Sequence, residues 1–221
     1  MTKTTRRDTL KLISAGAVAG LAPALWTTSA FAEGKRIAMV VKNLGNSYFD
    51  ACSKLARSLH RAFARDLDLP LDFFVDKLDR PLATLRALHY PASSGEGEIG
   101  AGEHTDYGNI TLLATDDVGG LEVRTRAGQW IAAPPMKEAY VVNIGDCLMR
   151  WTNDVYVSTP HRVVNRSGRE RYSIAFFFDP NPEARVEAIP SCVAAGAAAL
   201  YPPILAADYI KMRLDASKPA M

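Results

Sequence analysis

The chain has 221 residues, of which 48% are hydrophobic and 9% aromatic, a composition that suits a folded protein with one substantial core and excludes a disordered one. A net charge of +2 gives no electrostatic case for binding nucleic acid. The three cysteines are scattered and form no CxxC pair, which argues against a disulfide framework and against thiolate zinc sites.

The first 32 residues have the pattern of an export signal. Arg6 and Arg7 precede a weakly hydrophobic run over residues 12–26, and a small-x-small cleavage pattern ends at Ala32. The sequence therefore predicts a twin-arginine signal peptide over residues 1–32 and a periplasmic location. A membrane anchor is the alternative. The apolar run of about 15 residues is shorter than the roughly 20 that a span requires, so we expect no stable span after cleavage.

Residues 33–56 predict a strand followed by the start of a helix. The short apolar run at 35–41 is typical of a buried strand, and Ser47 is a suitable helix cap after the loop at 43–47. Together with the signal, residues 1–51 resemble the start of a periplasmic sugar-binding protein of a transport system. Such a protein would repeat strand–helix units, and none follow here. We therefore expect a fusion point near residues 51–57.

The rest of the chain predicts a helical lead-in over residues 57–81, a β-rich core over 82–182, and a C-terminal tail with a short helix over 183–221. Apolar residues from Leu55 to Leu67 follow helical spacing, and Pro70 ends that helix. Gly-rich turns, the first at residues 95–102, separate short apolar runs typical of a sandwich or barrel. The predicted strands are residues 83–90, 110–114, 121–124, 140–144, 147–151, 162–164 and 172–178.

Three residues in the β-rich part could share one metal ion. His104 and Asp106 are two apart, so in an extended segment both side chains project to the same side. With His161 they would form a facial triad of two imidazoles and one carboxylate, which leaves three coordination positions open for dioxygen and a chelating co-substrate. A closed tetrahedral zinc site is disfavoured because no fourth ligand is evident. The alternative is that His104 is an exposed loop residue and His161 an ordinary residue at the start of a strand.

A second motif ten residues further on favours the metal site. Arg171 and Ser173 share one face of the last long apolar strand, and an arginine directed into a barrel needs a carboxylate partner. A metal-bound dicarboxylate would supply it, with Arg171 bidentate on the far carboxylate and Ser173 donating a hydroxyl bond. Alternatively, Arg171 lies on the rim and pairs with Glu170 or Asp106 without any ligand.

The motifs of residues 57–215 resemble those of the iron(II)/2-oxoglutarate-dependent dioxygenases, in particular the isopenicillin N synthase-like group. The segments that carry the resemblance are residues 88–91, 103–106, 142–146, 158–163, 171–173 and 176–179. The resemblance implies a mostly β fold, the double-stranded β-helix or jelly roll, with flanking helices behind the cleavable signal. It implies that Tyr90 lies near the co-substrate, although Tyr90 can also be an ordinary residue of the strand core.

The same resemblance implies the cofactors and the reaction. His104, Asp106 and His161 would hold Fe(II), and Arg171 and Ser173 would hold the distal carboxylate of 2-oxoglutarate. The expected activity couples oxidative decarboxylation of 2-oxoglutarate by dioxygen to hydroxylation, desaturation or cyclisation of a small organic substrate, with ascorbate as reductant. No nucleic-acid partner is expected.

Two alternatives remain open at this stage, an inactive oxygenase fragment that still binds metal and a periplasmic solute-binding module. Members of the resembled family carry a longer region before the helix that starts near Leu55. We therefore expect an uncovered sheet edge, which the strand at residues 35–41 could pair with. The location is also open, because the family is mostly intracellular, and a cytoplasmic location is the alternative to the periplasm.

Overall fold

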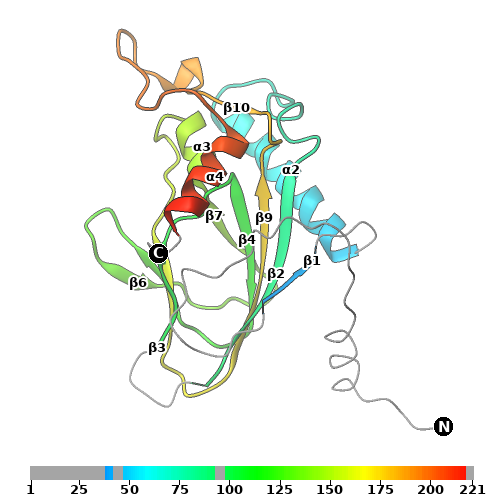
Figure 1. Cartoon of the computed structure of the whole chain (residues 1–221), viewed down its shortest axis with the longest axis vertical. Coiled ribbons are helices and arrows are strands. Elements are labelled where there is room, and N and C mark those ends of the chain that lie inside the picture. Colours follow the sequence, from blue (N-terminus) through cyan, green and yellow to red (C-terminus); the bar gives the residue numbers. More distant parts are fainter. Residues whose placement is uncertain (1–37, 42–46, 93–97, 218–221) are drawn as a thin grey trace, which may run out of the picture.

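The computed structural model describes residues 38–41, 47–92 and 98–217, and within these ranges it contains two main antiparallel sheets (Figure 1). The larger sheet has the strand order β1-β2-β9-β4-β7 and the smaller β3-β8-β5-β6, while β10 and β11 form a short ribbon. The strands are β1 Ala38–Val41, β2 Leu82–Tyr90, β3 Glu98–His104, β4 Ile110–Thr115, β5 Leu121–Arg124, β6 Trp130–Ala132, β7 Val141–Ile144, β8 His161–Asn165, β9 Arg171–Asp179, β10 Arg185–Val186 and β11 Ile204–Leu205. The helical elements are α2 Ser47–Asp66, α3 Asp146–Trp151, the 3-10 turn η1 Pro190–Cys192 and α4 Ala206–Ala216.

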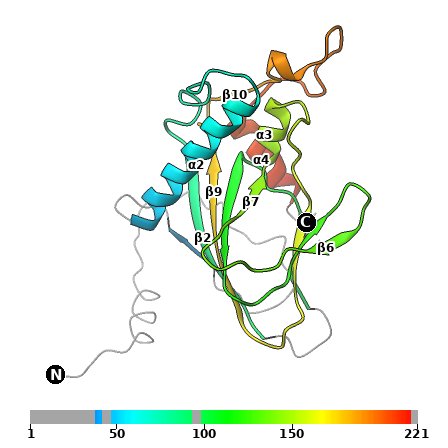
Figure 2. The ribbon, with the colours of Figure 1, turned by 180° about the vertical axis from the view of Figure 1, so that it is seen from behind.

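The alternation of side chains along β9 divides the interior into two cores. Phe176 and Phe178 are fully buried on the outer face of the larger sheet, where α2 covers them (Figure 2). The helix presents residues at i, i+4 spacing to that face, namely Cys52, Ala56, His60 and Ala64, as an amphipathic helix should. The opposite face of β9 points between the two sheets, where Ala175 packs with Leu113, Leu121 and Val163. This arrangement confirms the predicted jelly-roll fold and places the candidate site residues between the sheets.

Two predicted elements are wrong. The strand predicted over residues 147–151 is the helix α3, because the buried residues Cys147, Leu148 and Trp151 have helical spacing rather than strict alternation. The Gly-rich stretch at 95–102 is not a turn throughout, since β3 begins at residue 98 and pairs with β8. Gly100 is needed there, since a Cβ atom on it would lie 2.7 Å from the ring of Tyr90.

The strand predicted at residues 35–41 is β1 over residues 38–41, and it pairs antiparallel with the edge of β2. The helix predicted from Leu55 to Leu67 is α2, which begins earlier, at Ser47. The predicted signal at residues 1–32 lies outside the described residues. Within residues 38–41, 47–92 and 98–217, no helix combines the length and apolar character that crossing a membrane requires.

Candidate metal and co-substrate site

The structure brings His104, Asp106 and His161 together. His104 ends β3 and His161 begins β8, and the two residues are cross-strand partners with ring centroids 4.3 Å apart. Asp106 follows two residues after His104, and its Oδ1 lies 3.8 Å from Nε2 of His161. One ligand atom from each of the three residues lies within 4.8 Å of the others. Two imidazoles and one carboxylate converging in this way match the donor set of a facial triad.

Hydrogen bonds on the far side of each ring orient the two histidines. Nδ1 of His104 lies 2.7 Å from the carbonyl oxygen of Gly102, and Nδ1 of His161 lies 3.1 Å from that of Thr159. When Nδ1 donates to a carbonyl, the proton is on Nδ1 and the lone pair on Nε2 is free for an ion. Burial, together with the neighbouring His161, lowers the pKa of His104, which favours the neutral form that a metal requires.

The loop after His104 is held by the segment that begins α3. The N–H groups of Gly145, Asp146 and Cys147 donate to the carbonyl oxygens of Asn109, Asp106 and Gly108 at 2.8–2.9 Å. A Cβ atom on Gly145 would lie 2.2 Å from the carbonyl oxygen of Gly108, so the approach of the two backbones requires glycine. The backbone that carries Asp106 is therefore fixed by main-chain contacts.

Arg171 is a buried cation with no acidic partner among the described residues. It is 1% exposed, its guanidinium lies 4.8 Å from the ring centroid of Tyr90, and its Nη1 donates to Ser173 Oγ at 3.4 Å. Its Nε has no hydrogen-bond partner in the described part of the chain. Burying an uncompensated charge is costly, so this position fits a bound anion. The alternative in which Arg171 lies on the rim is wrong, because its side chain is buried. Glu170 instead accepts a hydrogen bond from the hydroxyl of Tyr172.

Three polar residues near the cluster of His104, Asp106 and His161 were not predicted as site residues. Asn143 on β7 donates through Nδ2 to Oδ2 of Asp106 at 3.3 Å. Arg86 on β2 lies with its guanidinium 5.3 Å from the ring centroid of Phe177. Asp179 ends β9, and burial together with the Asp106 charge raises its pKa to about 7.

The signal that would have found Asp179 was available in the sequence. It stands on the same face of β9 as Arg171, Ser173 and Phe177, because side chains two apart in a strand share a face. Asn143, Arg86 and Asp179 thus place hydrogen-bonding and charged atoms beside His104, Asp106 and His161.

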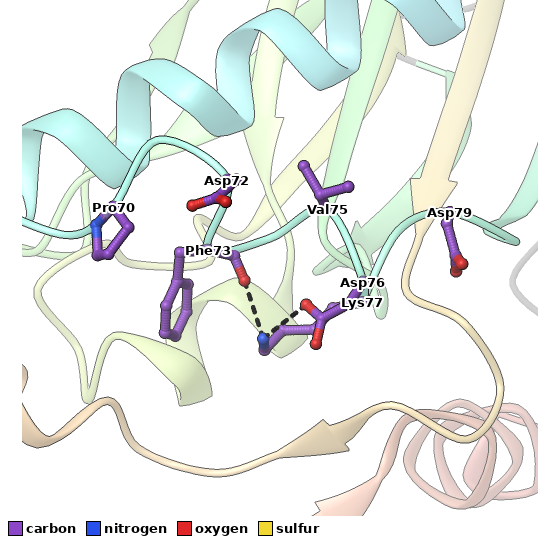
Figure 3. A pocket seen from close by; sticks show the side chains of 7 residues that line it. All are labelled: Pro70, Asp72, Phe73, Val75, Asp76, Lys77 and Asp79. Atoms are coloured by element: carbon purple, nitrogen blue, oxygen red, sulfur yellow. Dashed lines mark hydrogen bonds and ion pairs between the residues drawn. The ribbon is translucent and has the colours of Figure 1, made fainter.

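A separate hollow lies away from this cluster, in the segment between α2 and β2 (Figure 3). In its wall, Nζ of Lys77 donates to the carbonyl oxygen of Phe73 at 2.8 Å and to Asp76 at 2.9 Å. None of the predicted site residues lines this hollow. Its acidic side chains lie on an open surface and carry no indication of a ligand.

The chain is similar to known oxygenases in both sequence and structure. The family model of the 2OG-Fe(II) oxygenase superfamily matches residues 81–180. The 2-oxoglutarate-Fe(II) type oxidoreductase hxnY of Emericella nidulans is 44% identical over 169 residues, which cover 74% of this chain and 48% of that protein. A probable iron/ascorbate oxidoreductase of Dictyostelium discoideum is 46% identical over 153 residues, covering 61% of this chain and 42% of the relative. The chain spans about half the length of the curated relatives it matches.

Two solved structures extend this similarity. A full-length Neurospora crassa protein, crystallised in complex with alpha-KG and thymine, superposes with a TM-score of 0.75 at 31% identity, over 99% of this chain and 71% of that chain. A putative 2OG-Fe(II) oxygenase family protein from Caulobacter crescentus superposes with a TM-score of 0.73 at 30% identity, over 82% of this chain and 69% of that chain.

Proposed function

Because the chain belongs to the 2OG-Fe(II) oxygenase superfamily, we propose that it is an Fe(II)- and 2-oxoglutarate-dependent dioxygenase that hydroxylates, desaturates or cyclises a small organic substrate. The observation that carries this proposal is the convergence of His104, Asp106 and His161 near a buried Arg171 that has no acidic partner in the described part of the chain. The finer placement in the isopenicillin N synthase-like group is part of the proposal, and it is supported by the sequence motifs.

The residues present fit both groups. His104, Asp106 and His161 would hold Fe(II), and Arg171 with Ser173 would hold the distal carboxylate of 2-oxoglutarate. When bound, Fe(II) and 2-oxoglutarate would supply the oxidant, because the oxidative decarboxylation of 2-oxoglutarate to succinate consumes dioxygen. Ascorbate is the proposed reductant, consistent with the iron/ascorbate relative of Dictyostelium discoideum.

The side chains of the protein bind, orient and exclude water. Tyr90 covers one face of the Arg171 guanidinium, so a carboxylate pairing with Arg171 would be shielded from solvent and held more strongly. Asn143 fixes one oxygen of Asp106 and leaves the other directed toward His161. Arg86 and Asp179 interact electrostatically with each other and with Asp106, so the surroundings of the proposed metal ligands are polar, and we propose that the substrate carries polar groups rather than being a plain hydrocarbon.

The test uses the purified full chain with Fe(II), ascorbate and 2-oxoglutarate, and it measures succinate. The wild type should form succinate, and His104→Ala or Asp106→Ala should abolish it because each removes an iron ligand. Arg171→Ala should instead raise the KM for 2-oxoglutarate, since it removes the residue that binds the distal carboxylate but none of the iron ligands. Lys211→Met on the exposed face of α4 is the matched control and should behave as wild type.

The test also separates the alternative functions. Metal binding by the wild type without succinate formation would favour the inactive metal-binding fragment. The solute-binding module is not supported, because the core in the described residues is two antiparallel sheets rather than repeated strand–helix units.

We also propose, from sequence alone, that residues 1–32 act as a twin-arginine signal joined to the first strand of a sugar-binding transport protein and direct the enzyme to the periplasm. Arg6 and Arg7 before the apolar run support this proposal. Intact mass of the protein recovered from a periplasmic extract would test it. The proposal requires a mature chain that begins at Glu33, whereas an uncleaved chain in the cytoplasm contradicts it.

A further inference from the structure

Asp146 is a buried carboxylate next to the loop that carries Asp106, one of the proposed iron ligands. It is 1% exposed at the first position of α3. Its Oδ2 accepts hydrogen bonds from Nη1 of Arg213, from the hydroxyl of Tyr209 at 3.0 Å and from Oγ1 of Thr105 at 3.4 Å. A buried carboxylate is stable only when it is paired and hydrogen-bonded, and Arg213 supplies the compensating charge.

Arg213 connects α4 directly to the residues on both sides of Asp106. Its Nη2 donates to Oγ1 of Thr105 at 3.1 Å, and its guanidinium lies 4.6 Å from the ring centroid of Tyr107. The backbone N–H of Asp146, the anion that Arg213 pairs with, donates to the carbonyl oxygen of Asp106 at 2.8 Å. One guanidinium therefore contacts Thr105 and Tyr107 and pairs with the residue that binds the backbone of Asp106. The planar fork of arginine suits these several contacts, which the single ammonium of lysine cannot reproduce.

The docking of α4 does not depend on Arg213 alone. The N–H groups of Ala206 and Ala207 at the start of the helix donate to the carbonyl oxygens of Ala184 and Pro182 at 2.9 and 3.0 Å. Tyr209 is buried, and the guanidinium of Arg150 lies 4.9 Å from the centroid of the Tyr209 ring. Figures 1 and 2 show α4 beside α3 at the same end of the sheets. Loss of the Arg213 side chain should therefore leave the helix docked and affect mainly the loop.

We propose that Arg213 is a positioning residue that holds the Asp106 ligand in place, so that α4, near the C-terminal end of the chain, sets the metal affinity of a site formed by β3 and β8. The inference rests on the proposed function, because it supposes that His104, Asp106 and His161 bind the metal. Residues that orient metal ligands from outside typically contribute about 10–100-fold to metal affinity.

The experiment measures Co(II) binding to the full chain by titration calorimetry and by the visible absorption of the bound ion, without turnover. Arg213→Met should raise the Kd for Co(II) about 10-fold and change the absorption of the bound ion. Arg213→Lys should recover part of the affinity, since it restores the charge opposite Asp146. The matched control is Lys211→Met, two residues away on the same helix, where the exposed ammonium pairs with Asp215. Its Kd and its spectrum should equal those of the wild type.

A second variant keeps the proposal testable if Arg213→Met does not fold. Thr105→Val has nearly the same shape and removes only the hydroxyl, so it should raise the Kd about 5-fold, as expected for one lost hydrogen bond. The double variant should bind no more weakly than Arg213→Met alone, because both changes break the same connection.

Four results are decisive. Equal Kd values for Arg213→Met and Lys211→Met, or weaker binding that follows only the unfolded fraction measured by circular dichroism, would overturn the inference. With an unfolded Arg213→Met, an unchanged Kd for Thr105→Val overturns it equally. If His104→Ala binds Co(II) as tightly as the wild type, the proposed metal site itself fails, and that result is distinct from a failure of the Arg213 contact.

Discussion

His60 on α2 is buried in a neutral form that the surrounding structure enforces. It is 2% exposed, its Nδ1 donates to the carbonyl oxygen of Ala56 at 2.7 Å, and its Nε2 accepts from Nδ2 of Asn109 at 2.7 Å. Both ring nitrogens are therefore satisfied without a positive charge. Burial lowers the pKa of His60 to about 4 from an ordinary value of 6.5.

The sign and size of the effect on stability follow from this depressed pKa. The unfolded chain takes up a proton near pH 6.5, whereas the folded chain resists protonation down to about pH 4. The contribution of His60 to stability is complete above the unfolded pKa and is lost as the pH falls toward the folded pKa. Between about pH 8 and about pH 4, the free energy of unfolding should fall by about 3 kcal/mol because of this residue alone.

The assay compares urea unfolding of the wild type and of His60→Gln across this pH range, with metal removed by chelation. Glutamine places an oxygen near the position of Nε2, so it can still accept from Asn109, and it does not titrate. The wild type should be the more stable protein at pH 8, and its advantage should shrink by about 3 kcal/mol on going to about pH 4. A difference in unfolding free energy that stays constant across the range would refute the reasoning.

Three further changes have distinct expected outcomes. Asp179→Asn removes a carboxyl whose pKa is raised to about 7 in the folded protein, so the wild type loses stability as the pH rises through the range in which only the unfolded chain is ionised. In urea titrations, the free energy of unfolding of the variant relative to the wild type should therefore grow by up to about 4 kcal/mol between about pH 4 and above pH 7, and a pH-independent difference contradicts this. Gly145→Ala forces a Cβ atom against the carbonyl oxygen of Gly108 and should lower the free energy of unfolding by about 1–3 kcal/mol. The control Gly119→Ala, whose Cβ would have no atom within 4 Å, should lower it by less than half of that, and equal losses would argue against the close approach at Gly145. Arg171→Met should raise the melting temperature of the metal-free protein by removing an unpaired buried charge, yet it should lose most of the rise that 2-oxoglutarate adds to that of Mn(II) alone in the wild type. A variant that 2-oxoglutarate stabilises as much as the wild type would show that the anchor lies elsewhere.

Two pairs of candidate site residues could be predicted because their signals are local. The spacing of His104 and Asp106 and the alternation that links Arg171 to Ser173 need only the period of an extended chain. The pairing of β3 with β8, which brings His161 to His104, was not predicted, because the Gly-rich residues 95–102 were interpreted as a turn. The resemblance placed Tyr90 near the co-substrate, and the register of β2 against β9 makes Tyr90 a direct partner of Arg171.

The contacts around the cluster could not be predicted because they join residues far apart in the chain. Nothing in the sequence near Asp146 indicates that its partner is Arg213, and the contact requires the docking of α4 beside α3. The expected strand at 147–151 is a helix for the same reason, since tertiary burial of Leu148 and Trp151 decides between periods that a short apolar run leaves ambiguous.

The most direct test of the account is a crystal structure of the protein grown without oxygen in the presence of Mn(II) and 2-oxoglutarate. An anomalous peak should lie about 2 Å from a nitrogen of His104, a nitrogen of His161 and a carboxylate oxygen of Asp106. The distal carboxylate of 2-oxoglutarate should pair with the guanidinium of Arg171 and accept from Ser173. A metal bound elsewhere, or an Arg171 that pairs with no carboxylate when the metal is in place, would contradict the account.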